Sequence, residues 1–185
     1  MDGPLVLLDD VGALRLYASE AELAESGEDP GSTRCVIGRH GEYFHLLADP
    51  DARGLRVSRQ IGMIAHETLW EHLRRQREVA PELHRILRRF PESREDFLAE
   101  LFEELSLEAP GDQRAWTVSS QGQVWHCQGL DGVDRVVAQR AGVPDGKVVV
   151  RDPYGHAYVP RVVKHGSLAR RLRGRPLYVE VVGQE

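Results

Sequence analysis

Two short segments of this sequence end in an aromatic residue followed by histidine. Residues 41–45 read Gly-Glu-Tyr-Phe-His, and residues 122–126 read Gly-Gln-Val-Trp-His. Glycine tolerates the positive φ of a tight turn, and bulky residues favour strands, so each segment predicts part of a β-hairpin. Because imidazole titrates near neutral pH and ligates zinc, His45 and His126 are candidates for a general base or a metal ligand.

A third histidine, His156, directly follows a predicted turn at residues 152–155. If His45, His126 and His156 converge, they form a catalytic or zinc-binding group. Local spacing fixes no carboxylate beside them, and we favour the simpler interpretation of strand and turn histidines with ordinary hydrogen bonds. We therefore assign no metal and no cofactor to the chain.

Two further residues are candidates to assist such histidines. Asp152 shares the turn with His156, and Cys127 follows His126. A thiol needs a base or a positive charge to become a thiolate near neutral pH. Neighbours in a strand point to opposite faces, so if Cys127 faces inward, His126 faces out. We favour a buried structural cysteine, and we expect Cys127 and Cys35, the two cysteines of the chain, to be reduced.

The segment 66–72, His-Glu-Thr-Leu-Trp-Glu-His, invites comparison with the zinc-binding helix of metalloproteases. That helix needs its second histidine four residues after the first, and Trp70 stands there. His66 and His72 are six residues apart, which places them on well-separated faces of a helix. Glycine-rich phosphate loops and the Gly-x-Ser-x-Gly elbow are also missing from the sequence, which removes several large enzyme families.

Charge is unevenly distributed along the chain. The net charge is -5, and acidic residues dominate positions 2–29. Basic residues cluster near the C-terminal end: Arg161, Lys164, Arg170, Arg171, Arg173 and Arg175. This cluster predicts a charged face for a partner, although mutual neutralisation of the two regions is an equal alternative. Nucleic acid is a less favoured partner, because the chain is acidic and aromatic residues are sparse among the arginines.

The predicted elements are grouped and joined by hairpins. Strands are expected at residues 5–8, 14–17, 33–38, 43–47 and about 55–57, with a helix capped by Ser19 among them. Helical periodicity over 62–107, interrupted by Pro81 and Pro91, predicts a helical hairpin or a three-helix unit, its second helix at about 81–90. We therefore predict an α+β fold with mainly antiparallel sheets.

A cluster of helix breakers at residues 109–112 predicts a linker between two regions. The first region, 1–108, is the small sheet with the helices of the middle. The second, 113–185, is predicted to run β-β-α-β-β-α-β, with Asp131 and Ser167 as the N-caps of its helices.

The favoured function is a non-catalytic protein-binding module, similar to immunity proteins, antitoxins or adaptors, that presents a charged face to a macromolecule. The alternative is a histidine-based hydrolase or transferase, with or without a metal, and the third option is nucleic-acid binding through the basic segment. Short apolar runs and an acidic N-terminus lead us to expect a cytoplasmic protein without membrane segments. Unpaired sheet edges are compatible with a homodimer. The sequence identifies neither the partner nor a substrate.

Overall fold

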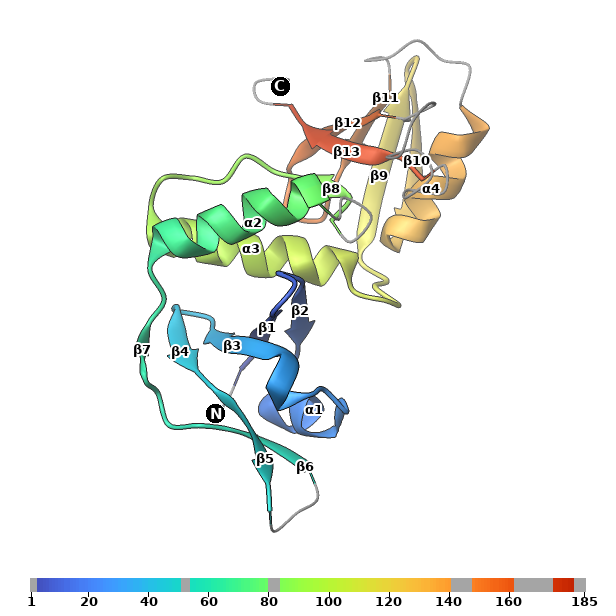
Figure 1. Cartoon of the computed structure of the whole chain (residues 1–185). Coiled ribbons are helices and arrows are strands. Elements are labelled where there is room, and N and C mark those ends of the chain that lie inside the picture. Colours follow the sequence, from blue (N-terminus) through green and yellow to red (C-terminus); the bar gives the residue numbers. More distant parts are fainter. Residues whose placement is uncertain (1–2, 51–53, 80–83, 141–147, 162–174, 182–185) are drawn as a thin grey trace. The chain divides into compact units, whose positions relative to one another are not determined.

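A computed structural model describes residues 3–50, 54–79, 84–140, 148–161 and 175–181. The chain divides into two compact units. The first consists of Met1–Val79 and Phe90–Leu105, and the second of Ala80–Arg89 and Ser106–Glu185 (Figure 1). The boundary falls inside a helix, so the breakers at 109–112 lie within the second unit.

The first unit is built on a five-stranded antiparallel sheet of order β2-β1-β3-β4-β7. Its strands are β1 (Leu5–Asp9), β2 (Leu14–Tyr17), β3 (Thr33–Gly38), β4 (Glu42–Phe44) and β7 (Gly62–Met63). A two-stranded ribbon pairs β5 (Leu46–Asp49) with β6 (Gly54–Val57). The single strand expected at 43–47 is therefore divided at His45, because Phe44 pairs with Val36 and Leu46 pairs with Val57.

Both faces of this sheet are covered, since β1 is buried along its whole length. Three helices cover them: α1 (Glu20–Glu25), α2 (His66–Val79) and α3 (Arg94–Glu108). The core on one face combines Val6 and Leu8 with residues of α2 and α3, and the core on the other combines Leu5 and Leu7 with Leu23 of α1. Alternate residues of one strand thus serve two cores.

Helix α1 begins as the sequence predicts, and a short 3-10 turn, η1 (Pro30–Ser32), follows it. The Ser19 hydroxyl accepts a hydrogen bond from the amide of Glu22 at 3.2 Å. The Glu22 carboxylate in turn accepts one from the amide of Ala18. In a standard capping box, the glutamate accepts a hydrogen bond from the amide of the capping serine. Here it accepts from the preceding residue, so the motif is shifted by one residue.

The helical hairpin or three-helix unit predicted over 62–107 is not confirmed. In the described part of residues 81–90, Ile86 and Leu87 form a short strand, β8 (Ile86–Leu87), instead of a helix. This strand pairs in parallel with β13 (Leu177–Glu180), some ninety residues away in the chain. Because short apolar runs fit a helix or a strand equally well, the distant partner decides between them. The same pairing accounts for the assignment of this segment to the second unit.

The second unit contains a six-stranded sheet of order β10-β9-β11-β12-β13-β8. The strands that precede β13 are β9 (Ala115–Ser120), β10 (Gln123–Gln128), β11 (Val148–Arg151) and β12 (Ala157–Arg161). Every pairing is antiparallel except that of β13 with β8. Mainly antiparallel sheets combined with helices support the α+β class. The helix expected after Ser167 lies outside the described residues.

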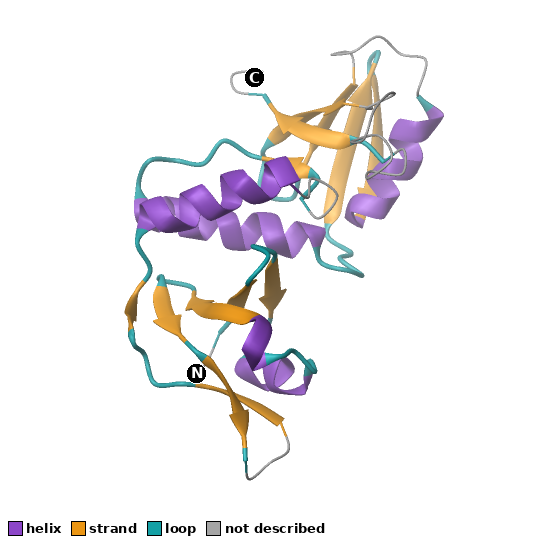
Figure 2. Ribbon diagram, viewed as in Figure 1, coloured by secondary structure: helices purple, strands orange, loops and turns teal. Residues whose placement is uncertain are grey.

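One helix of this unit, α4 (Gly129–Gln139), directly follows β10 and contacts both β9 and β10 (Figure 2). Val133 and Val137 pack in a core with Trp116 and Cys127. The prediction that Asp131 caps the helix is wrong, because the N-cap of α4 is Gln128, three residues earlier, and its side chain makes no capping bond. None of the described helices has the length and apolar character needed to span a membrane.

Candidate functional site

A polar pocket of about 470 Å³ lies on the second unit. Its walls come from the end of α3 and the following loop, from the first turns of α4, and from two arginines supplied by other segments. The charged lining residues are balanced, with three arginines and three carboxylates: Arg85, Arg135, Arg175, Glu108, Asp112 and Asp131. A concave surface with both signs of charge is suited to a ligand that carries both signs as well.

Arg85 is fixed by a buried network. Its Nη1 donates to both carboxylate oxygens of Asp134, at 3.0 and 2.8 Å. The hydroxyl of Tyr178 donates to the same carboxylate at 2.7 Å. Burial raises the pKa of Tyr178 far above its usual value, so this hydroxyl stays a donor. The network holds Arg85 in place without a ligand, as preorganised sites require.

Glu108 is fixed equally well on the other wall. One carboxylate oxygen accepts from the backbone amides of Arg85 and Ile86, at 2.5 and 2.7 Å. The second oxygen lies 3.1 Å from Nδ1 of His84, which is buried. Because Glu108 is on α3, these bonds attach the strand segment around β8 to the end of that helix. The charges of Arg85 and Glu108 are therefore largely satisfied internally.

The rim of the pocket is different, because its charges are accessible. Arg175 donates to Asp131 at 3.2 Å, and the two side chains are 57% and 78% exposed. Arg135 donates from Nε to the backbone carbonyl of Asp131 at 3.4 Å, and within the described part of the chain no carboxylate forms an ion pair with its guanidinium. Exposed ion pairs contribute about 0–1 kcal/mol, so a partner can replace them at little cost.

A close backbone contact holds the 109–114 loop against the start of α4. Gly129 has φ +61°, and a Cβ there would lie 2.0 Å from the carbonyl oxygen of Asp112. The amide of Gly129 also donates to the carbonyl of Arg114 at 3.0 Å. The guanidinium of Arg114 donates a hydrogen bond to the carboxylate of Asp112 at 2.6 Å. This wall therefore depends on a glycine at position 129.

The three candidate histidines are divided between the two units. His45 is exposed in the first unit, where its ring makes an edge contact with Tyr43 at 5.8 Å between centroids. His126 and His156 both belong to the second unit. The β-ladder aligns His126 with Thr117, Arg151 and Ala157, so three strand spacings of about 4.8 Å separate His126 from the start of β12, beside His156. Among the described residues, no three histidine, cysteine or carboxylate side chains gather as metal ligands.

His126 and Cys127 lie on opposite faces of β10, as strand alternation requires. His126 is exposed, whereas Cys127 is buried in the core beneath α4. Burial raises the pKa of the Cys127 thiol, and it does so for Cys35 too, to about 11. Both cysteines are free thiols in buried surroundings. The geometry gives the two neighbours separate environments.

Asp152 and His156 do share a polar cluster, but not as an acid–base pair. Asp152 is buried, and its carboxylate accepts from the backbone amides of Tyr154 and His156 at 2.9 and 3.0 Å. The imidazole of His156 instead contacts Glu180, with Nδ1 2.7 Å from the carboxylate. The aspartate thus holds the β11–β12 turn, and the histidine is oriented by a glutamate that local spacing could not reveal.

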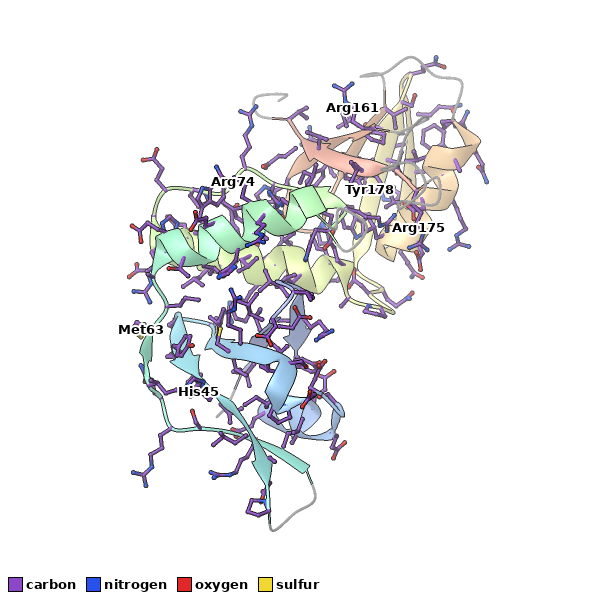
Figure 3. All side chains as sticks on the ribbon, viewed as in Figure 1. His45, Met63, Arg74, Arg161, Arg175 and Tyr178 are labelled. Atoms are coloured by element: carbon purple, nitrogen blue, oxygen red, sulfur yellow. The ribbon has the colours of Figure 1, made fainter. Side chains whose placement is uncertain are left out.

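Of the basic residues predicted to bind a partner, Arg175 lines the pocket (Figure 3). Arg161 is exposed at the end of β12. Lys164, Arg170, Arg171 and Arg173 lie outside the described residues. The ion pairs of Arg175 are with Asp131 and Asp134 of α4, and both of these residues belong to its own unit.

Sequence reasoning missed the other charged residues of the pocket. Arg85, Glu108 and Asp131 come from segments that only the fold brings together, so no local spacing marks them. The breakers at 109–112 were the nearest signal, since loops positioned by a rigid scaffold often carry function. Comparison with protein-family models, curated proteins and solved structures gave no match.

Proposed function

We propose that this protein is a non-catalytic binding module, of the immunity, antitoxin or adaptor kind, whose pocket on the second unit receives a charged segment of a protein partner. The observation that carries the proposal is the contrast between charged lining residues that are fixed and others that are accessible. Arg85 and Glu108 are held by partly buried hydrogen bonds, whereas Arg135 and Arg175 are exposed.

Arginine is well suited to such a rim. Its planar guanidinium makes paired hydrogen bonds to carboxylates, and arginine is enriched among the residues that dominate binding energy at protein interfaces. In the proposed complex, Arg135 and Arg175 bind acidic side chains of the partner. Asp131, released from its exposed ion pair with Arg175, accepts from a basic side chain.

The mixed charge also favours a protein over a nucleic acid. A phosphate backbone presents negative charge alone, and it would meet Glu108, Asp112 and Asp131 beside the arginines. A protein segment with both signs of charge can complement both. Long-range attraction of this kind accelerates association and weakens as salt is added.

The test is capture of a partner by immobilised full-length protein, with charge-reversed variants in parallel. The double variant R135E/R175E changes the rim, and R56E/R59E reverses two exposed arginines of the first unit as a matched control. We expect one protein to be retained by the wild type and by R56E/R59E, with at least tenfold weaker binding to R135E/R175E. Equal retention by all three proteins, each shown to be folded by circular dichroism, would contradict the proposal.

A second candidate, a histidine-based hydrolase or transferase, is supported by the His156–Glu180 pair. Glu180 is itself fixed, because its other oxygen accepts from the amide of Arg89 at 2.6 Å. A carboxylate that orients Nδ1 leaves Nε2 as the proton acceptor, as in catalytic triads. If this candidate holds, H156Q and E180Q lose activity together on ester or phosphoester substrates, while H126Q retains it.

A further inference from the structure

We propose that the chain forms a two-fold symmetric homodimer in which β10 pairs antiparallel with β10 of a second copy. The edge of the second sheet carries this inference, which does not depend on the pocket. Strand β10 is terminal in the order β10-β9-β11-β12-β13-β8, and its described partner is β9 alone. Among the residues that the structure describes, no strand pairs with the other side of its backbone.

The turn before β10 identifies which backbone groups point outward. Gln121 and Gly122 have φ +51° and +78°, the two positive values of a type I′ hairpin. In such a hairpin the closing pair, here Ser120 and Gln123, is hydrogen-bonded, and hydrogen-bonded pairs then alternate along the ladder. The outward groups are consequently the N–H and C=O of Val124 and His126 and the N–H of Gln128, because the carbonyl of Gln128, the N-cap of α4, accepts the first hydrogen bond of that helix.

This edge lacks the features that normally prevent strand pairing. Residues 123–128, Gln-Val-Trp-His-Cys-Gln, include no Lys, Arg, Asp, Glu or Pro, and their register with β9 continues for six residues without a bulge. Sheet edges are usually protected by such residues, by bulges or by shortness. The opposite edge of the same sheet, β8, has only two residues. Strand β10 is thus a long, even and uncharged edge.

A second copy of β10 satisfies this edge better than an arbitrary strand, because the edge is complementary to itself. Pairing centred on His126 places Val124 opposite Gln128 of the second copy, and the reverse. The two His126 residues then exchange two hydrogen bonds, and the amide of each Gln128 donates to the carbonyl of Val124 of the other copy, which gives about four hydrogen bonds. Because β10 carries no charged residue, the net charge of -5 on each copy is not concentrated at this contact.

The exposed side chains along β10 support the same arrangement. Val124, on the face opposite the helix, is a large apolar side chain that is 59% exposed. In the dimer it lies beside the second copy's strand, whose cross-strand side chains approach within about 5 Å. On the other face Trp125, partly buried under Arg140 at 4.4 Å, comes opposite Cys127 of the second copy. The pairing extends both the polar face and the helix-covered face of the sheet.

The decisive experiment uses charge at the two-fold axis, where His126 of each copy meets the other. Sedimentation equilibrium is expected to show a dimer for the wild type and for the neutral control H126N. H126E and H126K, each alone, place like charges opposite each other and are expected to weaken the dimer at least tenfold. An equimolar mixture of H126E and H126K is expected to restore a dimer that contains one copy of each.

A second variant tests the backbone pairing directly. H126P removes an outward N–H that pairs with His126 of the second copy while leaving the bonds to β9, so it is expected to be monomeric with an unchanged circular dichroism spectrum. R135E/R175E, altered at the pocket rim, is expected to stay dimeric, which separates this inference from the proposed function. A monomeric wild type at every concentration, or a dimer that H126E and H126P leave equally strong, would overturn it.

Discussion

Arg88 and Asp152 form an ion pair in which both side chains are completely buried. Nη2 of Arg88 lies 2.5 Å from Oδ2 of Asp152, and Tyr158 donates to the same oxygen at 2.7 Å. Burial raises the pKa of Tyr158 far above its usual value, so the hydroxyl remains a donor. The pair connects the segment after β8 to the β11–β12 turn inside the second unit.

Breaking this pair should strongly destabilise the second unit. R88M leaves the Asp152 carboxylate buried without its cation, and loss of one partner of a buried pair costs about 3–5 kcal/mol. The measurement is urea unfolding followed by the fluorescence of Trp116 and Trp125 in a W70F background. R135M, at an exposed arginine of the same unit, should change the free energy of unfolding by less than about 0.5 kcal/mol. A similar small loss for R88M would contradict the prediction.

Gly129 should tolerate no side chain. In G129A the new Cβ meets the carbonyl of Asp112 in a left-handed conformation, so strain and overpacking add to about 2–5 kcal/mol. G155A is the matched control, because Gly155 has φ +97° but nothing within 4 Å of the methyl group that alanine would add. It should lose only the conformational cost, about 1–2 kcal/mol. Equal decreases in the free energy of unfolding of the two variants would show that the contact with Asp112 does not contribute to the destabilisation.

Alkaline pH should destabilise the first unit through Tyr17. Burial, and next the hydrogen bond to Glu28, raise the pKa of Tyr17 from 10.0 to about 12. A raised folded-state pKa means that the neutral phenol is favoured by folding, so its contribution is complete below pH 10 and is lost as pH rises to about 12. Ultraviolet difference titration should detect this late ionisation, and Y17F should remove it. A titration curve between pH 10 and 12 that is identical in Y17F and the wild type would refute the prediction.

The two thiols should react slowly in the folded protein. Burial is the largest cause of the raised pKa of both Cys35 and Cys127, and the thiolate is the reactive form. Iodoacetamide at neutral pH should modify neither residue appreciably in the native state and both in urea, as mass spectrometry can show. Rapid native modification of Cys127 would make it a candidate nucleophile again.

The elements that could be predicted from sequence are those whose signals are local. Ser19 and Glu22 cap a helix through neighbouring backbone groups, and Gly122 sits in a two-residue turn between strands that follow each other. The segment around Ile86 could not be predicted, because a strand ninety residues away decides its conformation. The ion pair of Arg88 with Asp152 could not be predicted either, since only the folded sheet brings the two residues together.

The candidate site divides in the same way. Arg175 was predicted to contact a partner from a run of like charges, which is a local feature. The residues that build the pocket around it, such as Arg85 and Glu108, take their places through bonds to Asp134 and to the backbone near β8. Pockets formed by three separate segments leave no spacing pattern in one sequence.

The most direct test of the proposed binding pocket is to locate the partner on the protein. Hydrogen–deuterium exchange of the full-length chain, with and without the captured partner, reports which amides the complex protects. We expect protection of the 109–114 loop and of the first turns of α4, and loss of that protection in R135E/R175E. Protection confined to the first unit, with residues 109–135 exchanging as in the free protein, would contradict it.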